Sequence, residues 1–238
     1  MAVEYEPENS ILVDARKNVE TYKMLETTLC SKNDASISMA KRLRALFTLK
    51  SLGGELAIQA IEKAFQDESS ALLKHELAYV LGQMKDERAV PVLINVLDDQ
   101  QEDPMVRHEA AEALGAISDK IALPILQKYL NDPEDCVRET CELAVDLINF
   151  NENNKLCVDE SDEIPSSGFC SVDPAPAMKS TKSIDELKKM LLNKDETLFK
   201  RYRAMFTLRN LNNTESVLAL VEGFNDTSAL FRHEIAYV

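Results

Sequence analysis

An internal duplication constrains this chain more than any other feature of its sequence. Residues 42–49 (RLRALFTL) return at 201–208 (RYRAMFTL), and residues 70–80 (SALLKHELAYV) return at 228–238 (SALFRHEIAYV). The first offset is 201 − 42 = 159 and the second is 228 − 70 = 158, so one residue is missing from the second copy. We place this deletion near residues 53–54. Two matches of this length in the same order predict two similar halves.

A shorter repeat lies inside the first half. Residues 74–76 (KHE) recur as residues 107–109 (RHE), which is 107 − 74 = 33 positions later. Residues 137–139 (VRE) follow, and we align their glutamate with the earlier glutamates, which places Arg138 in the histidine position. A period near 33 residues is typical of proteins built from stacked helical hairpins.

Each unit reads as two helices. Pro91 and Pro124 fall in the opening turn of a predicted first helix, where a missing N–H costs nothing. The predicted second helix has apolar residues at i, i+3, i+4 and i+7. These are Leu77, Val80, Leu81 and Met84 in one unit and Ala110, Ala113, Leu114 and Ile117 in the next. Because one hairpin cannot bury its apolar stripe alone, we predict an all-α, HEAT-like solenoid with a concave inner face.

The repeat pattern breaks between residues 150 and 180. This stretch is acidic, rich in serine and contains prolines, a composition typical of a linker. A capped helix start is expected again at Ser183. We therefore predict an N-terminal HEAT-like half at residues 1–149, an acidic linker at 150–180 and the start of a C-terminal HEAT-like half at 181–238.

The charge balance and the cysteines narrow the class of function. Of 238 residues, 27 are basic and 41 acidic, and the net charge is −14. Nucleic-acid-binding proteins carry a basic surface, so we predict no nucleic acid partner, whereas an acidic surface attracts a cationic one. No apolar stretch is long enough to span a membrane. The five cysteines form no C-x-x-C motif and read as reduced thiols, which favours a cytoplasmic location.

The three histidines carry the strongest functional signal. Each is followed directly by glutamate, which gives the pairs His75-Glu76, His108-Glu109 and His233-Glu234. All three pairs fall in the first turn of a predicted second helix, the helix that lines the concave face of such stacks. Neighbouring residues on a helix point about 100° apart. The histidine and the glutamate of one pair therefore point toward different ligand-binding centres.

Imidazole and carboxylate together suit iron. Two histidines and one carboxylate form the ligand set of non-haem Fe(II) oxygenases, and di-iron proteins use the same ligand types. Zinc is disfavoured because the chain has no thiolate motif and no H-E-x-x-H. Stacking brings His75 and His108 together on one wall, while His233 and Glu234 come from the opposite wall. The alternative is that these pairs are solvated surface residues without a ligand role.

Other repeated residues have predicted structural roles. Tyr79 and Tyr237, which are equivalent in the two copies, are expected to pack. Arg44 and Arg203 are expected to form ion pairs between repeats. Glu139 is predicted to be a structural or electrostatic residue and not a ligand.

Taken together, these features resemble the deoxyhypusine hydroxylase family. The resemblance rests on the duplicated HEAT-like halves, the tandem His-Glu pairs, the motif at 70–80 and 228–238, and residues 171–176 (SVDPAP). It implies a di-iron monooxygenase, with two Fe(2+) ions in a complete protein. The family uses molecular oxygen to hydroxylate the deoxyhypusine side chain of a eukaryotic translation initiation factor, which completes hypusine.

The resemblance also implies a role for each site residue. His75, His108 and Glu234 would hold one iron, and His233 and Glu76 would hold the other. Glu109 would be the catalytic residue nearest the substrate amine, or a further ligand. The implied partners are the deoxyhypusine-bearing initiation factor and molecular oxygen, and no membrane is implied.

Two other classes of function stay open at this point. One is a non-enzymatic HEAT scaffold whose groove clasps a partner peptide, in which the histidines are incidental and the protein holds no metal. The other is a HEAT-like lyase acting on a bilin chromophore, which needs neither iron nor paired His-Glu sites across two halves. Elemental analysis of the purified protein separates both from the hydroxylase.

The family has four His-Glu pairs, and this sequence has three. The fourth is expected about one repeat of 33 residues after His233, beyond Val238, so we expect a longer parent protein. We predict that the 238-residue chain binds the second iron poorly and hydroxylates weakly or not at all. Iron counted per chain by elemental analysis tests this, and two tightly held irons would contradict it.

Overall fold

The chain folds into paired helices. The computed structural model describes residues 18–156, 171–179 and 182–238, and every regular element within them is helical, which confirms the predicted all-α class. The first half contains α2 (Val19–Leu29), α3 (Met39–Leu52), α4 (Glu55–Asp67), α5 (Ala71–Met84), η1 (Glu87–Ala89), α6 (Val90–Asp98), α7 (Pro104–Ile117), η2 (Lys120–Ala122), α8 (Leu123–Lys128) and α9 (Asp135–Leu156). The second half contains α10 (Ile184–Leu192), α11 (Leu198–Leu211), α12 (Thr214–Val221), η4 (Glu222–Asn225) and α13 (Ala229–Tyr237). Among these described helices, none has the length and apolar content needed to cross a bilayer.

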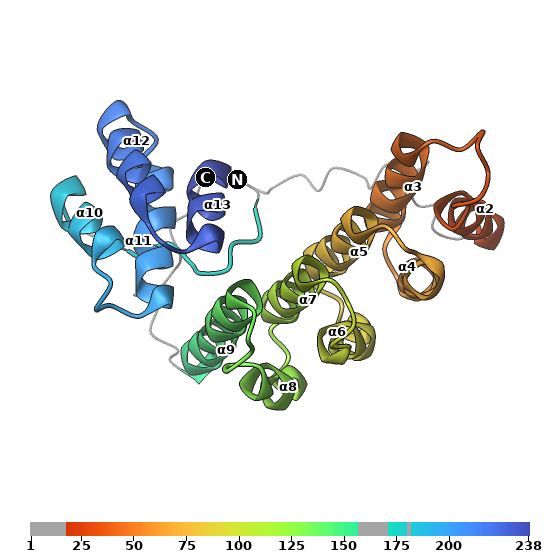
Figure 1. The fold of residues 1–238 in the computed structure, drawn as a ribbon, viewed down its shortest axis with the longest axis horizontal. Helices are drawn as coiled ribbons and strands as arrows, with labels where there is room; N and C mark the ends of the chain where they lie inside the picture. Colours follow the sequence, from red (N-terminus) through yellow and green to blue (C-terminus); the bar gives the residue numbers. More distant parts are fainter. Residues whose placement is uncertain (1–17, 157–170, 180–181) are drawn as a thin grey trace, which may run out of the picture.

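The first half has an inner and an outer row of helices. Figure 1 shows α3, α5, α7 and α9 as one continuous row, with α4, α6 and α8 along its outer side. Small residues let the inner helices approach closely. A Cβ added at Gly82 would lie 2.8 Å from the Cα of Ala113, and one at Gly115 would lie 3.0 Å from the Cα of Ala144. Neighbouring inner helices are therefore fixed against each other almost at backbone contact.

The predicted apolar stripes form the core of this row. Leu77, Val80, Leu81, Ala110, Ala113 and Leu114 are buried, and Met84 and Ile117 are partly buried against them. The prolines also lie where expected, because Pro91 and Pro124 occupy the first turns of α6 and α8. The hairpin interpretation of each unit is confirmed for these repeats.

A buried arginine joins one repeat to the next at three places. Arg42, Arg107 and Arg201 each donate Nε to a carbonyl near the end of the preceding outer helix, at Leu29 (2.7 Å), Leu97 (3.1 Å) and Leu191 (2.9 Å) respectively. The other end of each guanidinium pairs with an acid in the turn of the following repeat, at Glu68, Asp132 (2.7 Å) and Asp226 (2.6 Å). Each arginine thus ties three consecutive chain segments together.

The buried ion pairs described above are made by Arg42 and Arg201, two residues before Arg44 and Arg203. Ion pairs between repeats at Arg44 and Arg203 stay a prediction. Arg203 donates Nε to the carbonyl of Pro176 at 3.0 Å.

The two halves have separate cores that meet on α9. One face of α9 packs in the core of the first half, while Leu143 and Leu147 belong to the core of the second. Near its end, the ring of Phe150 lies 5.7 Å from the ring of Phe199 in α11. Because α9 contributes to both cores, it is the element on which the halves are joined.

The structure describes only part of the segment predicted to link the two halves. α9 ends at Leu156, beyond the predicted end of the first half at residue 149. Residues 157–170 and 180–181, which include about half of the predicted acidic linker, lie outside the described residues. The division into two halves at these boundaries stays a prediction.

The described part of the predicted linker packs on the second half. Ala175 and Ala177 are buried in its core. Arg209 of α11 donates two hydrogen bonds to Asp173, at 2.9 and 2.7 Å. Residues 171–179 therefore belong structurally to the second half.

The helix boundaries relocate the deletion between the two copies. The ends of α3 and α11 differ by 211 − 52 = 159, the starts of α4 and α12 by 214 − 55 = 159, and the starts of α5 and α13 by 229 − 71 = 158. The missing residue therefore lies between the start of α4 and the start of α5, not near residues 53–54. The predicted capped start at Ser183 is confirmed, because its side chain accepts from the amide of Glu186 while Glu186 accepts from the amide of Ser183 at 2.8 Å.

Replacing Glu68 by glutamine tests the arginine bonds. Burial raises the pKa of Glu68, but hydrogen bonds from the amide of Ser70, from Arg42 and from the amide of Ser69 outweigh it and hold the pKa below its usual value. A lowered pKa stabilises the fold above the unfolded carboxyl pKa of about 4.3, and this stabilisation is lost as pH falls through the folded pKa. We expect Glu68→Gln to cost about 2–4 kcal/mol at neutral pH and much less at about pH 3.

Urea unfolding at the two pH values measures this difference. Glu62→Gln is the matched control, because it makes the same chemical change at an exposed position of α4. A difference between Glu68→Gln and the unaltered chain that is equal at both pH values would contradict the assigned ion pair.

Candidate metal centre

The three His-Glu pairs line one cavity. The cavity has a volume of about 310 Å³ and is bordered by α5, α7 and α13 together with residues 171–179. Its lining includes all six predicted site residues, His75, Glu76, His108, Glu109, His233 and Glu234. Pairs from both halves of the duplication therefore share one hollow.

The pairs share one position in their helices. α5, α7 and α13 begin at residues 71, 104 and 229, so each histidine is the fifth residue of its helix. The pairs thus lie at the start of the second turn, one turn later than predicted. Because the inner helices are stacked in register, the same helix position in successive repeats points to the same place.

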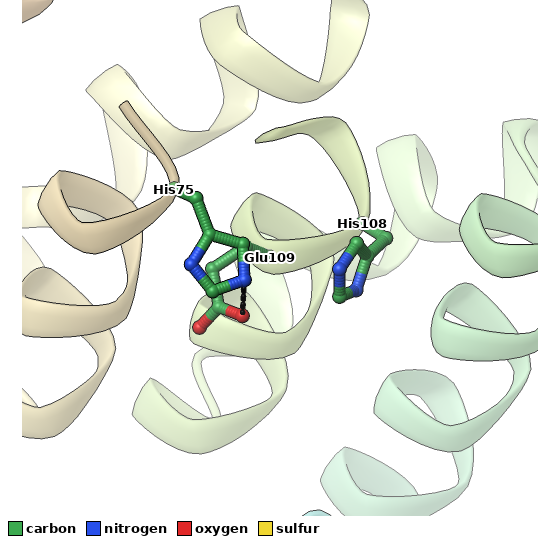
Figure 2. A group of neighbouring side chains, drawn as sticks. All are labelled: His75, His108 and Glu109. Carbon is green, nitrogen blue, oxygen red and sulfur yellow. Dashed lines mark ion pairs between the residues drawn. The ribbon is translucent and has the colours of Figure 1, made fainter. Parts of the chain in front are cut away.

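His75, His108 and Glu109 form the closest cluster. Figure 2 shows the three side chains converging from α5 and α7. The Nε2 of His75 lies 3.1 Å from Oε2 of Glu109, and the rings of His75 and His108 are 5.7 Å apart. One possible ligand atom from each of the three residues lies within 4.8 Å of the other two. Two imidazoles and one carboxylate thus present their possible ligand atoms close together.

His108 is buried without a hydrogen-bond partner. It is 3% exposed, and neither ring nitrogen has a partner among the described residues. Burial lowers the pKa of His108 to about 4, with the charges of His75 and His233 acting in the same direction and that of Glu109 opposing them. A buried polar group without a partner costs about 1–3 kcal/mol. A neutral imidazole in this position is in the form that binds a metal ion.

The pKa of His75 is shifted in the opposite direction from that of His108. Burial lowers its pKa, but the hydrogen bond with Glu109 and the charges of Glu109 and Glu76 outweigh burial and raise it. Its Nδ1 lies 3.5 Å from Oε1 of Glu76. His75 is therefore held between two carboxylates.

Carboxyl groups crowd the inner end of the cavity. Burial and the charges of Glu109 and Asp173 raise the pKa of Glu234 to about 7. Burial, again with the charges of Glu109, Glu234 and Asp173, raises the pKa of Glu112 well above its usual value. Glu112 and Glu234 therefore resist ionisation, first because they are buried and then because other carboxyl groups are close. A cation placed among them would relieve this repulsion.

The site residues from the second half are less closely grouped than those from the first half. The side chain of His233 is 66% exposed, and its Nε2 lies 4.0 Å from Oε1 of Glu234, which is 9% exposed. His233, Glu234 and Glu76 line the cavity but do not belong to the three-residue cluster with ligand atoms within 4.8 Å. Their roles as ligands stay a prediction.

Three further cavity residues were not predicted as site residues. Tyr79, Glu112 and Tyr237 each follow a site histidine by four positions and line the cavity. The two tyrosines, predicted above to pack, also hydrogen-bond to each other, and burial with Tyr237 raises the pKa of Tyr79 to about 12. Residues at i and i+4 share one face of a helix. This spacing is the signal that could have identified them.

The chemistry of the cluster fits a transition-metal ion. Histidine nitrogen and carboxylate oxygen bind such ions at about 2.0–2.2 Å, so two ligands of one ion lie at most about 4.4 Å apart. The 4.8 Å span of the cluster needs to close by only a few tenths of an ångström. The ion would also give His108 the partner that its ring nitrogens lack.

We predict that His108→Leu weakens binding of Co²⁺, used as a spectroscopic probe, by about 100-fold or more. Loss of a supporting group alone weakens metal affinity by about 10–100-fold, and His108 is expected to be a direct ligand. Glu62→Ala, on the outer surface of α4, serves as control and keeps the affinity of the unaltered chain. Equal affinities in the two variants would rule out a site at this cluster.

The chain is similar in sequence to known proteins. Residues 58–146 match the family of HEAT repeats. The chain is 52% identical over 206 residues to deoxyhypusine hydroxylase from Drosophila melanogaster, an alignment that covers 87% of this chain and 66% of that protein. It is 59% identical over 197 residues to deoxyhypusine hydroxylase from Xenopus laevis, covering 83% of this chain and 62% of that protein.

A solved structure shows the same fold. Human deoxyhypusine hydroxylase in complex with glycerol matches with a TM-score of 0.84 and 44% sequence identity, over 96% of this chain and 75% of that one. The human sequence itself is 50% identical over 205 residues, covering 86% of this chain and 65% of that protein. This chain spans just under two thirds of the length of these curated relatives.

Proposed function

This chain belongs to the deoxyhypusine hydroxylase family, and we propose that its cavity holds iron and takes part in the O₂-dependent hydroxylation of deoxyhypusine on a translation initiation factor. In this reaction one oxygen atom enters a C–H bond of the substrate and the other leaves as water. Two electrons and two protons are consumed, so an external reductant is required. A complete site would hold two Fe(2+) ions.

One observation supports the proposal more than any other. His108 is buried and neither ring nitrogen has a hydrogen-bond partner among the described residues, while possible ligand atoms of His75 and Glu109 lie within 4.8 Å of it. A structural histidine in a core normally has a hydrogen-bond partner. A cluster of this composition is expected to bind a metal, and two histidines with one carboxylate suit Fe(II).

We propose the following division of the ligands. His75, His108 and Glu234 hold one iron, and His233 and Glu76 belong to the other. When bound, the iron supplies the activation of molecular oxygen. Glu109 hydrogen-bonds His75 at 3.1 Å, which orients that imidazole, and it is also close enough to act as a ligand itself.

The remaining acids suit a cationic substrate arm. The deoxyhypusine side chain carries amines, and Glu109 and Glu112 lie among carboxyl groups whose mutual repulsion is relieved by positive charge. We assign Glu109 as the catalytic residue nearest the amine. Tyr79 and Tyr237 line the same cavity.

Binding to the substrate tests this proposal separately from turnover. We predict that the iron-loaded chain binds the deoxyhypusine-bearing initiation factor at least about 10-fold more tightly than the factor with an unmodified lysine, a difference of about 1.4 kcal/mol. Glu109→Gln should remove most of this preference, because the amine loses a carboxylate, and Glu62→Gln should retain it. Isothermal titration calorimetry measures both.

Turnover is measured with ¹⁸O₂ and a chemical reductant. The proposal expects one ¹⁸O atom in the product, detected by mass spectrometry of the modified peptide. A chain that binds no iron and does not distinguish the two forms of the factor would instead be a helical-repeat scaffold.

A further inference from the structure

Glu139 continues the row of site histidines into the fourth repeat. It is the fifth residue of α9, which begins at residue 135, as His75 and His108 are in α5 and α7. The backbone supports this alignment, because the amides of Arg107 and Arg138 donate in the same way to the residue before each helix. Glu139 therefore occupies the histidine position of its repeat and not the glutamate position, which corrects the alignment made from the sequence.

The side chain of Glu139 crosses to the second half. Its Oε2 accepts a hydrogen bond from Oγ of Ser228 at 2.6 Å. Ser228 is the N-cap of α13, and the same Oγ accepts from the amide of Phe231 at 3.0 Å. A hydroxyl has one proton to donate, so the bond to Glu139 orients its lone pairs toward the helix amide. The carboxyl group also lies at the end of α13 where negative charge is favoured.

This contact is made at the start of the helix that carries His233 and Glu234. His233 follows Ser228 by five residues, which is about 7.5 Å along a helix. The cap at Ser228 and the buried side chains of Phe231 and Ile235 together hold the start of α13, from which His233 and Glu234 project. α11, by contrast, is held on the first half through Phe199 and the ring of Phe150.

We propose that Glu139 is a positioning residue: through Ser228 it fixes α13 on α9 and so places Glu234 at the cavity opposite His75 and His108. The inference rests on the proposed metal-binding function for its consequence, but the contact itself does not depend on a metal. Loss of the contact should leave the cluster of α5 and α7 in place and release α13. The two effects can therefore be measured separately.

Hydrogen exchange tests the contact without any metal. In Glu139→Ala, we expect amide exchange in α13 to accelerate by about 10-fold or more while α5 is unchanged. Glu139→Gln keeps an acceptor oxygen and should restore most of the protection. Ser70→Ala is the matched control, because Ser70 caps α5 in the equivalent position, accepting from Leu73 at 3.3 Å. It removes a cap alone and should not affect α13. Unchanged exchange of α13 in Glu139→Ala would overturn the proposal.

A double-mutant cycle on Co²⁺ affinity tests the consequence. Glu234→Ala should weaken binding by about 10-fold in the unaltered chain and by less than about 2-fold in the Glu139→Ala background, because α13 no longer presents Glu234 there. Equal losses in both backgrounds would overturn the positioning role. If Glu234→Ala has no effect in the unaltered chain while α13 still exchanges faster in Glu139→Ala, the contact stands and the proposed ligand role of Glu234 fails.

Discussion

The buried arginine bonds between repeats are the interaction on which the site depends. Arg107 joins the end of α6 to the turn before α9, and it immediately precedes His108. A guanidinium with two fixed acceptors has almost no freedom to rotate, and breaking a buried pair of this kind costs about 3–5 kcal/mol. The bond therefore fixes both the start and the rotation of α7. Because His108 and Glu109 lie on α7, its rotation about its own axis directs their side chains toward the cavity.

Because the inner helices stack closely, residues that recur at a fixed period in the sequence come together as a cluster of possible ligands. Gly82 and Gly115 let the inner helices approach nearly to backbone contact, so corresponding residues of adjacent repeats lie one helix spacing apart. His75 and His108 are separated by 33 residues in the chain, yet their rings are 5.7 Å apart. The geometry comes from the regularity of the stack and needs no special loop. A larger residue at Gly82, which faces Ala113 of α7, would push α5 away from α7 and separate the two rings.

The sequence predicted the parts of the site that depend on period and spacing. The stack, the inner position of the three pairs and the clustering of His75 with His108 follow from a repeat of constant length. Errors appeared where a helix start decides the answer. The buried ion pairs between repeats are made by Arg42 and Arg201, which were not singled out, and Glu139 was aligned one position away from its place. Contacts between halves, such as Glu139 with Ser228, carry no periodic signal and could not be derived from spacing.

The cavity is also a place where the fold is less stable than it could be. Within the part of the chain that the structure describes, neither ring nitrogen of His108 has a hydrogen-bond partner, and burial with neighbouring charges raises the pKa of Glu112 and Glu234. These features oppose folding, and a sequence selected for stability alone would replace them with apolar side chains. They persist on a frame held rigid elsewhere by arginine pairs and glycine contacts. Any cation that binds among these groups satisfies the imidazole and relieves the repulsion together, so binding and stability are coupled at this site.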